Sequence, residues 1–327
     1  MKPSIKKLSE LTGLNKSTIS RALNHCGGVD AQTAAMVNRL ARELGYVAPK
    51  NREESPSCCI VLPQNPDYFW SLAKERLFAV LTEERVRFRA ALYPMLTDED
   101  AFFSALDAMI ALHPQLILAA VPAFPAAVDR VRKLSEEIPI FLLGERLDIA
   151  NVFYFGSDRR SDGRLLGQTF QKAYPDKRRV LIIDSIQDRA RTDEFLAACP
   201  ALKPVGRLEN DEWNNSASSL LARRIAAEYA GEFDCVYCST GLLPLVCLAM
   251  DKLKLPPDIV CVGYENPPGN AKYIASGRIG PVLCQDIAQQ SELCARAAAR
   301  FVRERVFPGQ KYTFIPSRMF WREDSQN

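Results

Sequence analysis

The stretch SIKKLSELTGLNKSTISRALN, residues 4–24, contains two short apolar patterns separated by a glycine. In the first pattern Ile5, Leu8 and Leu11 recur with the spacing of one face of a helix. Gly13 then interrupts the run and supplies the backbone freedom that a tight turn needs. The sequence therefore opens with a short predicted helix that ends in a turn.

A second short helix is predicted directly after this turn. Asn15 is a suitable N-cap, and the apolar side of the helix would carry Ile19, Ala22 and Leu23. Small polar and basic residues are left on the outer side, namely Lys16, Ser17, Ser20 and Arg21. Two such helices are typical of a helix-turn-helix, whose second helix enters the DNA major groove, where arginine can bind guanine through two hydrogen bonds. An ordinary surface hairpin of two helices is the alternative interpretation of this pattern alone.

A third helix completes a small predicted domain over residues 1–48. Asp30 is a suitable N-cap, and Gly45 stands where a C-terminal cap belongs. The inner stripe of this helix consists of apolar residues at helical spacing, namely Val37, Leu40, Ala41 and Leu44. Three short helices in so short a segment predict a compact all-α headpiece.

Three segments of this headpiece, residues 4–24, VDAQT at 29–33 and LARELGYVAP at 40–49, resemble the headpiece of the LacI/GalR (lactose-repressor type) family in order and spacing. The resemblance implies sequence-specific binding to double-stranded operator DNA. It places base-reading side chains at Lys16, Ser17 and Arg21. It places phosphate contacts at a second set of positions, namely Ser4, Thr18, Ser20, Asn24 and Tyr46. For Tyr46, an aromatic at the edge of the headpiece core is the alternative.

Charge is distributed unevenly along the 327 residues, whose formal net charge is +3. The first 52 residues hold nine Lys and Arg against three Asp and Glu, whereas the rest of the chain holds 33 against 36. A basic small domain on a mildly acidic body is what a DNA-binding head joined to a sensor body would show. Solubility alone would also explain a basic head, so charge by itself does not distinguish a DNA-binding head from one that is only soluble.

The sequence predicts a cytoplasmic protein without a membrane span, a cofactor or a metal. No apolar run approaches the ~18 residues of a transmembrane helix, and the chain begins with a polar amphipathic segment. The ten cysteines are then expected to stay reduced. Cys235 and Cys238 have C-x-x-C spacing but lie within the apolar run FDCVYC, which favours a buried strand over redox or metal chemistry.

Residues 49–57, PKNREESPS, are predicted to be a linker. In the LacI/GalR family this region normally forms a hinge helix, whose leucine inserts into the minor groove and kinks the DNA. Here the segment contains Glu53, Glu54 and Pro56 and no leucine. We therefore expect an atypical hinge without a helix or a leucine wedge, which leaves the coupling between effector and DNA affinity open.

From Cys58 onward, short apolar runs alternate with amphipathic helical stretches, which predicts parallel sheets with helices on both faces. A body over residues 58–327 is too long for one comfortable sheet. It resembles the effector domain of the same family, which implies two Rossmann-like lobes of the periplasmic-binding-protein type, three crossovers and a homodimer. The expected first lobe spans about 58–156 and 285–309, and the second about 157–284 and 310–327.

The same resemblance implies an effector site, for a sugar or a sugar derivative, in the cleft between the lobes at the ends of their strands. Its residues come from four segments and one further position, and they are Asn65, Tyr68, Phe69, Trp70, Arg191, Trp213, Glu265 and Gln285. Aromatic faces would cover the apolar side of a sugar ring, while arginine and carboxylate would bind its hydroxyls. A core tryptophan is the alternative for Trp213, and a surface arginine for Arg191.

The residues around this predicted effector site depart from the family pattern at three places. Glu194 replaces a glycine, Glu265 replaces an aspartate, and Ser239 with Thr240 replaces an Asn-Asp pair. We therefore expect that the pocket binds a ligand different from a plain hexose, or that it is degenerate and binds none.

We expect a transcriptional regulator, most simply a repressor bound as a homodimer to a near-palindromic operator. A regulator uncoupled from its ligand is the alternative. An enzyme is not expected, because no G-x-G-x-x-G, P-loop or G-x-S-x-G follows a strand. A solute-binding transport component is disfavoured by the predicted headpiece.

Overall fold

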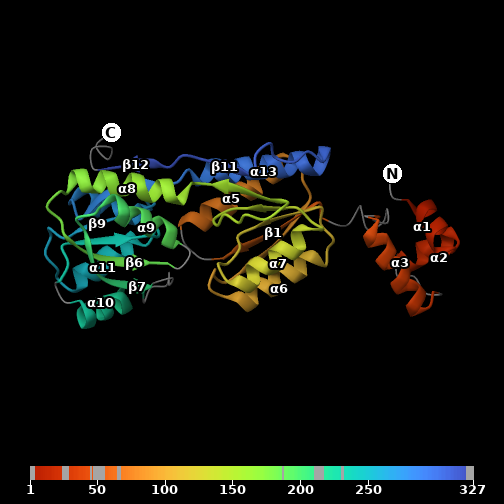
Figure 1. Ribbon diagram of the computed structural model, residues 1–327, viewed down its shortest axis with the longest axis horizontal. Coiled ribbons are helices and arrows are strands. Elements are labelled where there is room, and N and C mark those ends of the chain that lie inside the picture. Colours follow the sequence, from red (N-terminus) through yellow and green to blue (C-terminus); the bar gives the residue numbers. More distant parts are fainter. Residues whose placement is uncertain are drawn as a thin grey trace. The chain divides into compact units, whose positions relative to one another are not determined.

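The computed structural model describes residues 4–23, 29–44, 46, 56–64, 68–185, 188–209, 217–229 and 232–321. The chain divides into two compact units at the bond between Pro56 and Ser57 (Figure 1). Each unit has its own hydrophobic core, and the two are described separately below.

The first unit, the headpiece, contains three helices, α1 (Ile5–Thr12), α2 (Lys16–Leu23) and α3 (Ala31–Glu43). The predicted caps of α2 and α3 are confirmed, because Asn15 accepts the backbone N–H of Thr18 at 2.8 Å and Asp30 accepts that of Thr33 at 2.8 Å. Gly13 ends α1 in the left-handed region at φ 70°, as a tight turn requires. Gly45, the expected C-terminal cap of α3, lies outside the described residues.

Apolar side chains from all three helices meet in the core of the headpiece. Its buried members are Leu8, Ile19, Ala22, Leu23, Val37 and Ala41. Leu11, the third apolar residue of the first pattern, is instead 51% exposed. The predicted small helical domain is thus present, with one turn of α1 less buried than its spacing indicated.

The second unit, the body, consists of two lobes, each built on a six-stranded sheet. In the first lobe the strands run in the order β11-β5-β4-β3-β1-β2, and every pair of neighbours is parallel. Its elements are β1 (Cys58–Pro63), α5 (Tyr68–Glu83), β2 (Phe88–Tyr93), α6 (Glu99–Ile110), β3 (Leu116–Ala119), α7 (Pro125–Ser135), β4 (Ile140–Leu142), β5 (Val152–Gly156), α13 (Ile287–Glu304) and β11 (Tyr312–Phe314).

In the second lobe the order is β12-β10-β9-β8-β6-β7, and only β12 is antiparallel to its neighbour β10. Its elements are α8 (Arg159–Ala173), β6 (Arg179–Asp184), α9 (Arg189–Ala198), β7 (Lys203–Glu209), α10 (Ala217–Glu228), β8 (Cys235–Cys238), α11 (Leu243–Lys252), β9 (Val260–Tyr264), η2 (Pro268–Asn270), α12 (Ala271–Ala275), β10 (Ile279–Cys284) and β12 (Arg318–Phe320). The two-lobed α/β body with parallel sheets was therefore predicted correctly from the sequence.

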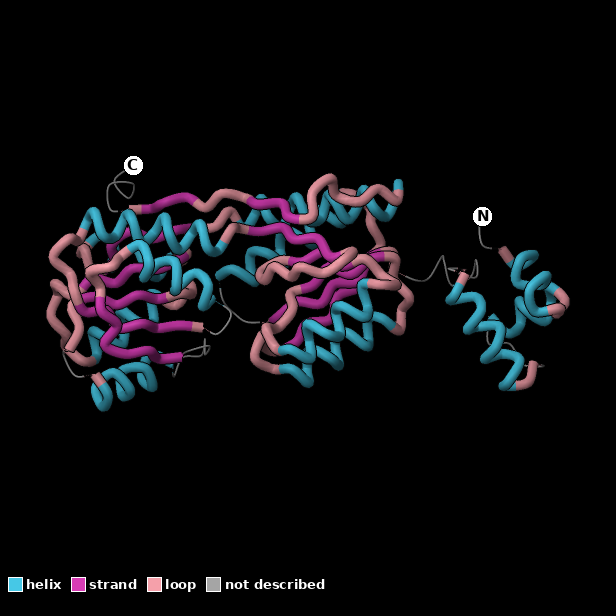
Figure 2. Tube along the Cα trace, viewed as in Figure 1, coloured by secondary structure: helices cyan, strands magenta, loops and turns pink. Residues whose placement is uncertain are grey.

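Each sheet carries one apolar cluster on either face, where helices cover it (Figure 2). Cys235 and Cys238 illustrate the arrangement, because they point to opposite faces of β8 and join different clusters. Burial raises the pKa of both thiols. The prediction of a buried strand at FDCVYC is thus confirmed, and the two sulfur atoms are not placed to act as a pair.

The chain crosses between the lobes three times, after β5, after β10 and after β11. The expected boundary at the end of the chain is wrong in one respect, because residues 310–327 do not all belong to the second lobe. Tyr312–Phe314 forms β11, which pairs with β5 and adds an edge strand to the first sheet. The last crossover therefore lies between Phe314 and Arg318.

Candidate functional site

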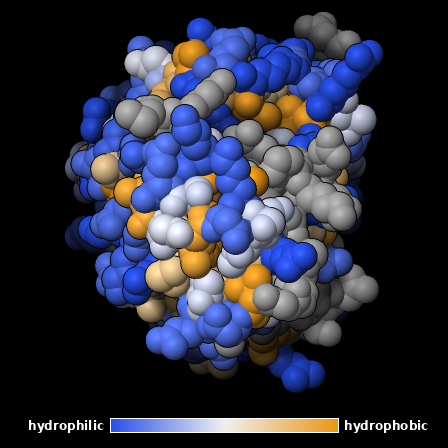
Figure 3. Space-filling view, turned by 90° about the vertical axis from the view of Figure 1, so that its right-hand side faces the viewer, coloured by the Kyte–Doolittle hydropathy of each residue, from blue (hydrophilic) through white to orange (hydrophobic). Residues whose placement is uncertain are grey.

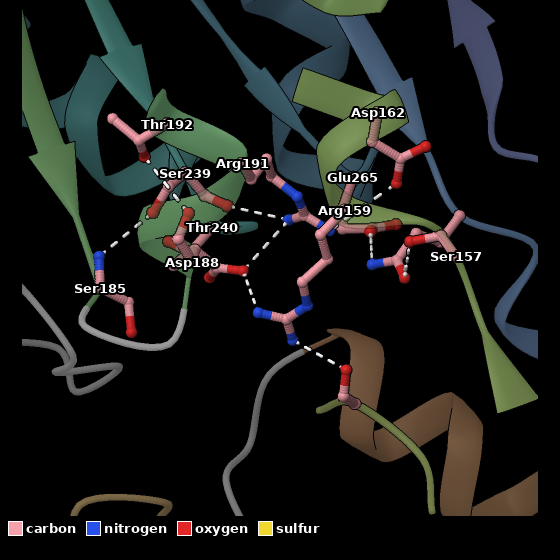
Figure 4. A network of polar contacts seen from close by, with 12 residues as sticks. Ser157, Arg159, Asp162, Ser185, Asp188, Arg191, Thr192, Ser239, Thr240 and Glu265 are labelled. Carbon is pink, nitrogen blue, oxygen red and sulfur yellow. Dashed lines mark hydrogen bonds and ion pairs between the residues drawn. The ribbon is translucent and has the colours of Figure 1, made fainter. Parts of the chain in front are cut away.

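Polar and charged side chains from strand ends of both lobes meet near the crossovers between the lobes (Figure 4). Because carboxyl ends of parallel strands share one edge of a sheet, residues far apart in the sequence come together there. We call this group the interlobe cluster, which consists of Glu145, Ser157, Arg159, Asp162, Asp188, Arg191, Glu265 and Gln285.

Arg191, in the first turn of α9, lies at the centre of the interlobe cluster and is 3% exposed. Its Nη1 donates to the carbonyl oxygen of Ser239 at 3.0 Å and lies 3.5 Å from Asp188 Oδ1. Its guanidinium lies over the ring of Tyr264, 3.9 Å from the ring centroid. Within the described part of the chain, Nε and Nη2 have no hydrogen-bond acceptor.

Burial favours the neutral form of Arg191, but Asp188 and other neighbours outweigh this and raise its pKa above the ordinary value. The guanidinium is therefore charged, buried and only partly hydrogen-bonded. The alternative of a surface arginine is wrong for this residue. The nearby Arg189 does lie at the surface, where Nη2 contacts Glu209 Oε1 at 2.6 Å.

Glu265 directly follows β9 and is 4% exposed. Its Oε1 accepts a hydrogen bond from Gln285 Nε2 at 2.8 Å. Burial raises the pKa of this carboxyl to about 7, although the bond from Gln285 and the charge of Arg191 act in the opposite direction. Its backbone has φ 61°, in the left-handed region that non-glycine residues seldom adopt. Such strained residues are concentrated at functional sites.

Gln285 links Glu265 to the first crossover between the lobes. Its Oε1 accepts from Ser157 Oγ at 3.0 Å, just after β5, and from Gln290 Nε2 at 3.4 Å. The structure thus brings three of the residues predicted from the sequence together, namely Arg191, Glu265 and Gln285.

Arg159, the first residue of α8, connects the two lobes and was missed by the sequence analysis. Its Nη1 donates to Asp188 Oδ1 at 2.6 Å in the second lobe. In the first lobe Nη2 donates to the carbonyl oxygen of Gly144 at 3.0 Å, and Nη1 lies 3.4 Å from Glu145 Oε2. Figure 4 shows the side chains of Arg159 and Arg191 converging on Asp188. Since Asp188 is shared, the charges of the two arginines are coupled.

The residues predicted from the turn after β1 differ in how far they are buried. Tyr68, the first residue of α5, is 39% exposed, and burial and then the charge of Glu265 raise its pKa. Phe69 is half-buried and packs edge-on against Trp70. Trp70 itself is only 5% exposed and packs in the core of the first lobe. Asn65 and Trp213 lie outside the described residues.

In the headpiece, the three predicted base-reading residues, Lys16, Ser17 and Arg21, are exposed on α2. They lie opposite the face of the helix that is buried in the core. Ser17 Oγ donates to the side chain of the N-cap Asn15 at 2.7 Å.

The predicted phosphate-contacting positions vary in exposure. Ser4 caps α1 by accepting the backbone N–H of Lys7 at 3.2 Å, and Thr18 and Ser20 are half-buried. Tyr46 is half-buried and packs against the headpiece core, as in the alternative interpretation. Asn24 lies outside the described residues.

Hydrophilic residues cover most of the face drawn in Figure 3, and hydrophobic residues appear between them in small groups. Such a mixture is ordinary for a water-exposed protein surface. Among the helices that the structure describes, none is long and apolar enough to cross a membrane. Within the same residues, no group of three or more His, Cys, Asp or Glu side chains is placed to hold a metal ion.

Residues 59–305 match the family model of the periplasmic binding protein domain, and the chain therefore belongs to this family. No curated protein matches the sequence significantly.

Solved structures with a similar fold include sugar-binding proteins and a regulator. A glucose-galactose binding protein from Geobacillus stearothermophilus has a TM-score of 0.72 and 16% identity, over 82% of this chain and 98% of its own. A carbohydrate transporter solute binding protein from Agrobacterium radiobacter, in complex with D-arabinose, has a TM-score of 0.73 and 15% identity, over 83% and 95%. A protein from Bacteroides fragilis assigned as a LacI transcriptional regulator has a TM-score of 0.69 and 14% identity, over 83% and 99%. At such identities the likeness concerns the fold alone.

Proposed function

We propose that this chain is a cytoplasmic transcriptional regulator of the LacI/GalR type, a repressor whose body binds a sugar or a sugar derivative between its lobes. The main support for this proposal is that one chain contains both a helical headpiece and a body of the periplasmic-binding-protein family. A helical headpiece exposes Lys16, Ser17 and Arg21 on one face of α2, and it precedes a body of the periplasmic-binding-protein family. This proposal does not include a catalytic activity.

The surface of α2 has the chemistry needed to read DNA. The buried face of the helix fixes its orientation through Ile19, Ala22 and Leu23, so Lys16 and Arg21 are directed away from the core. An exposed arginine on such a helix can bind guanine bidentately in the major groove. The cap residue Ser4 and the hydroxyls of Thr18 and Ser20 are suited to the phosphates beside it.

We propose a homodimer on a near-palindromic operator. Two headpieces separated by one helical turn of DNA would each contact one half-site. The charge of the N-terminal segment, nine basic against three acidic residues within the first 52, favours association with the phosphate backbone.

In the body, the interlobe cluster offers the groups that hold a sugar. Arg191 has two buried donor nitrogens, Nε and Nη2, without an acceptor among the described residues, and leaving such a donor atom unsatisfied costs about 1–3 kcal/mol. Ligand hydroxyls would accept from them, while Glu265 and Gln285 would bind further hydroxyls. The similar fold of a glucose-galactose binding protein and of a protein holding D-arabinose favours a carbohydrate.

Selection of binding sites from a library of random duplex DNA tests this proposal. The full-length protein would be used, alone and with a panel of sugars and sugar phosphates. We expect a short near-palindromic consensus whose binding one of the sugars weakens. A consensus that no ligand alters would leave a DNA-binding regulator that is uncoupled from its body. Binding without any consensus would contradict the proposal and favour a solute-binding role, which similar structures of transporter components also suggest.

A further inference from the structure

In the interlobe cluster, carboxylates outnumber guanidinium groups. The carboxylates are Glu145, Asp162, Asp188 and Glu265, and the guanidinium groups are those of Arg159 and Arg191. Asp188 accepts a hydrogen bond from Arg159 and lies 3.5 Å from Arg191, whereas Asp162 lies 3.9 Å from Arg191 and accepts a hydrogen bond from Ser317 Oγ at 3.0 Å. Two negative charges are therefore in excess when all four carboxylates are ionised.

The charged groups around the cluster are engaged mainly in ion pairs with one another. Asp184 lies 3.4 Å from Arg207, and Glu209 lies 2.6 Å from Arg189. Glu194, on the outer side of α9, contacts Arg160 at 3.1 Å and Arg164 at 2.9 Å. Glu194 has two arginine partners, which leaves one positive charge over, but both guanidinium groups are more than half exposed, where solvent screens them from the buried cluster.

Glu265 is the carboxylate that most lacks a cation. Within the described part of the chain, no Lys or Arg nitrogen lies within 4.0 Å of its oxygens, and its side chain accepts only from the neutral Gln285. Its pKa is about 7 because burial favours the protonated form more strongly than the hydrogen bond from Gln285 and the charge of Arg191 favour the ionised form. A positive charge supplied beside Glu265 would stabilise its ionised form.

Two further observations describe the ligand that would supply this charge. Nε and Nη2 of Arg191, buried and without acceptors among the described residues, require oxygen atoms such as sugar hydroxyls. Tyr68 is partly exposed, the charge of Glu265 helps to raise the pKa of its hydroxyl, and an aromatic ring of this kind can cover a cation. Hydroxyl groups and a positive charge are combined in one class of carbohydrate.

We propose that the ligand of the interlobe cluster is a hydroxylated amine, such as an amino sugar, with its ammonium group against Glu265 and Tyr68 and its hydroxyls on Arg191. This assignment rests on the sugar-binding function proposed above and makes it more specific. Neutral sugars lack the charge that Glu265 would pair with. Sugar acids and sugar phosphates would add negative charge to a site that already has an excess.

Calorimetric titration of the full-length protein at pH 7 tests the assignment. The ligands are D-glucosamine, D-glucose, N-acetyl-D-glucosamine and D-glucuronate, together with the corresponding galactose series. Because a pKa shift of one unit corresponds to a factor of ten in binding, we expect the amines to bind at least roughly tenfold more tightly than the parent sugars. N-acetylation, which removes the charge, should abolish this advantage, and the uronates should bind weakest.

Glu265→Gln retains the shape of the side chain and should reduce the preference for the amine to less than about threefold. Asp176→Asn is the matched control, because it removes an exposed carboxylate of the same lobe and should leave the preference unchanged. If Glu265→Gln does not fold, wild-type protein still provides a readout. At pH 6.5 amines should expel a fraction of a proton from Glu265, measured as a binding enthalpy that depends on the buffer, whereas neutral sugars should not.

The possible failures are distinguishable. Neutral or acidic sugars that bind as tightly as the amines would overturn the amine assignment and leave the sugar-binding function intact. If no sugar in either series binds, whatever its charge, the sugar-binding part of the proposed function is wrong and the amine assignment with it.

Discussion

Replacing Gly163 by alanine should destabilise the body and displace Arg191. Gly163 and Gly167 lie one turn apart on α8, where this helix packs closely against α9. A Cβ atom on Gly163 would lie 2.1 Å from the carbonyl oxygen of Arg191 and 3.0 Å from its carbonyl carbon. Because these are backbone atoms, they cannot move aside as the end of a flexible side chain can.

The expected magnitude follows from two opposing effects. Overpacking typically costs up to about 3 kcal/mol, while alanine gains about 1 kcal/mol over glycine inside a helix. The net loss is then about 2 kcal/mol, which corresponds to a fall in the melting temperature of roughly 4–8 °C for a domain of this size.

Thermal unfolding of the full-length variant, followed by circular dichroism, would measure this loss. Gly309→Ala is the matched control, because a Cβ atom there meets nothing within 4 Å and its φ is not in the left-handed region. We expect the control to melt within about 1 °C of the wild type, as most surface substitutions do. A Gly163→Ala variant as stable as this control would refute the close contact between α8 and α9 that positions Arg191.

Three further predictions concern charges in the body and the headpiece. Arg159→Ala removes the nearest donor of Asp188 and of the Gly144 carbonyl, which keep only Arg191 at 3.5 Å and the Tyr154 hydroxyl at 3.4 Å, and it should lower the free energy of unfolding in urea by about 2 kcal/mol. Arg130→Ala, which breaks an exposed ion pair, should cost less than about 1 kcal/mol, and equal losses would contradict the interlobe role. Glu265 has a native pKa of about 7 against an ordinary 4.5, so the native state binds the extra proton and the free energy of unfolding falls as pH rises to 7. In urea titrations, Glu265→Gln should remove roughly 2 kcal/mol of this fall between pH 5.5 and 8. An unchanged pH profile would show that the carboxyl is not buried. Arg21→Ala should cost ~1–3 kcal/mol in operator affinity and relax one base position, whereas equal weakening on every sequence would exclude base reading.

The local patterns of the sequence were sufficient for most of the fold. Alternating apolar runs and amphipathic stretches correctly predicted two lobes with parallel sheets, and the caps Asn15 and Asp30 marked where helices begin. The pairing of Tyr312–Phe314 with β5 was not predictable in this way. A strand of three residues has too few positions to show a period, and its partner is distant in the sequence.

The candidate site was predicted in part, for reasons that differ from residue to residue. Arg191, Glu265 and Gln285 follow or flank strands, and the ends of parallel strands meet at one edge. Arg159 was missed because one of its acceptors is the backbone carbonyl of Gly144, which no side-chain pattern reveals. Trp70 is buried because each residue of a helix is rotated by about 100°, so two positions after the exposed Tyr68 the side chain already points into the core.

The most direct test of the central claim, that a DNA-reading headpiece precedes a sugar-binding body, is the ratio of two affinities. The full-length protein would be titrated with the duplex enriched by selection and with a scrambled duplex of the same composition, at physiological salt. We predict that the enriched duplex binds at least about a thousandfold more tightly, the lower range for specific recognition, and that Arg21→Ala lowers this ratio. Equal affinity for the two duplexes, with both weakening alike as salt increases, would contradict sequence reading by α2.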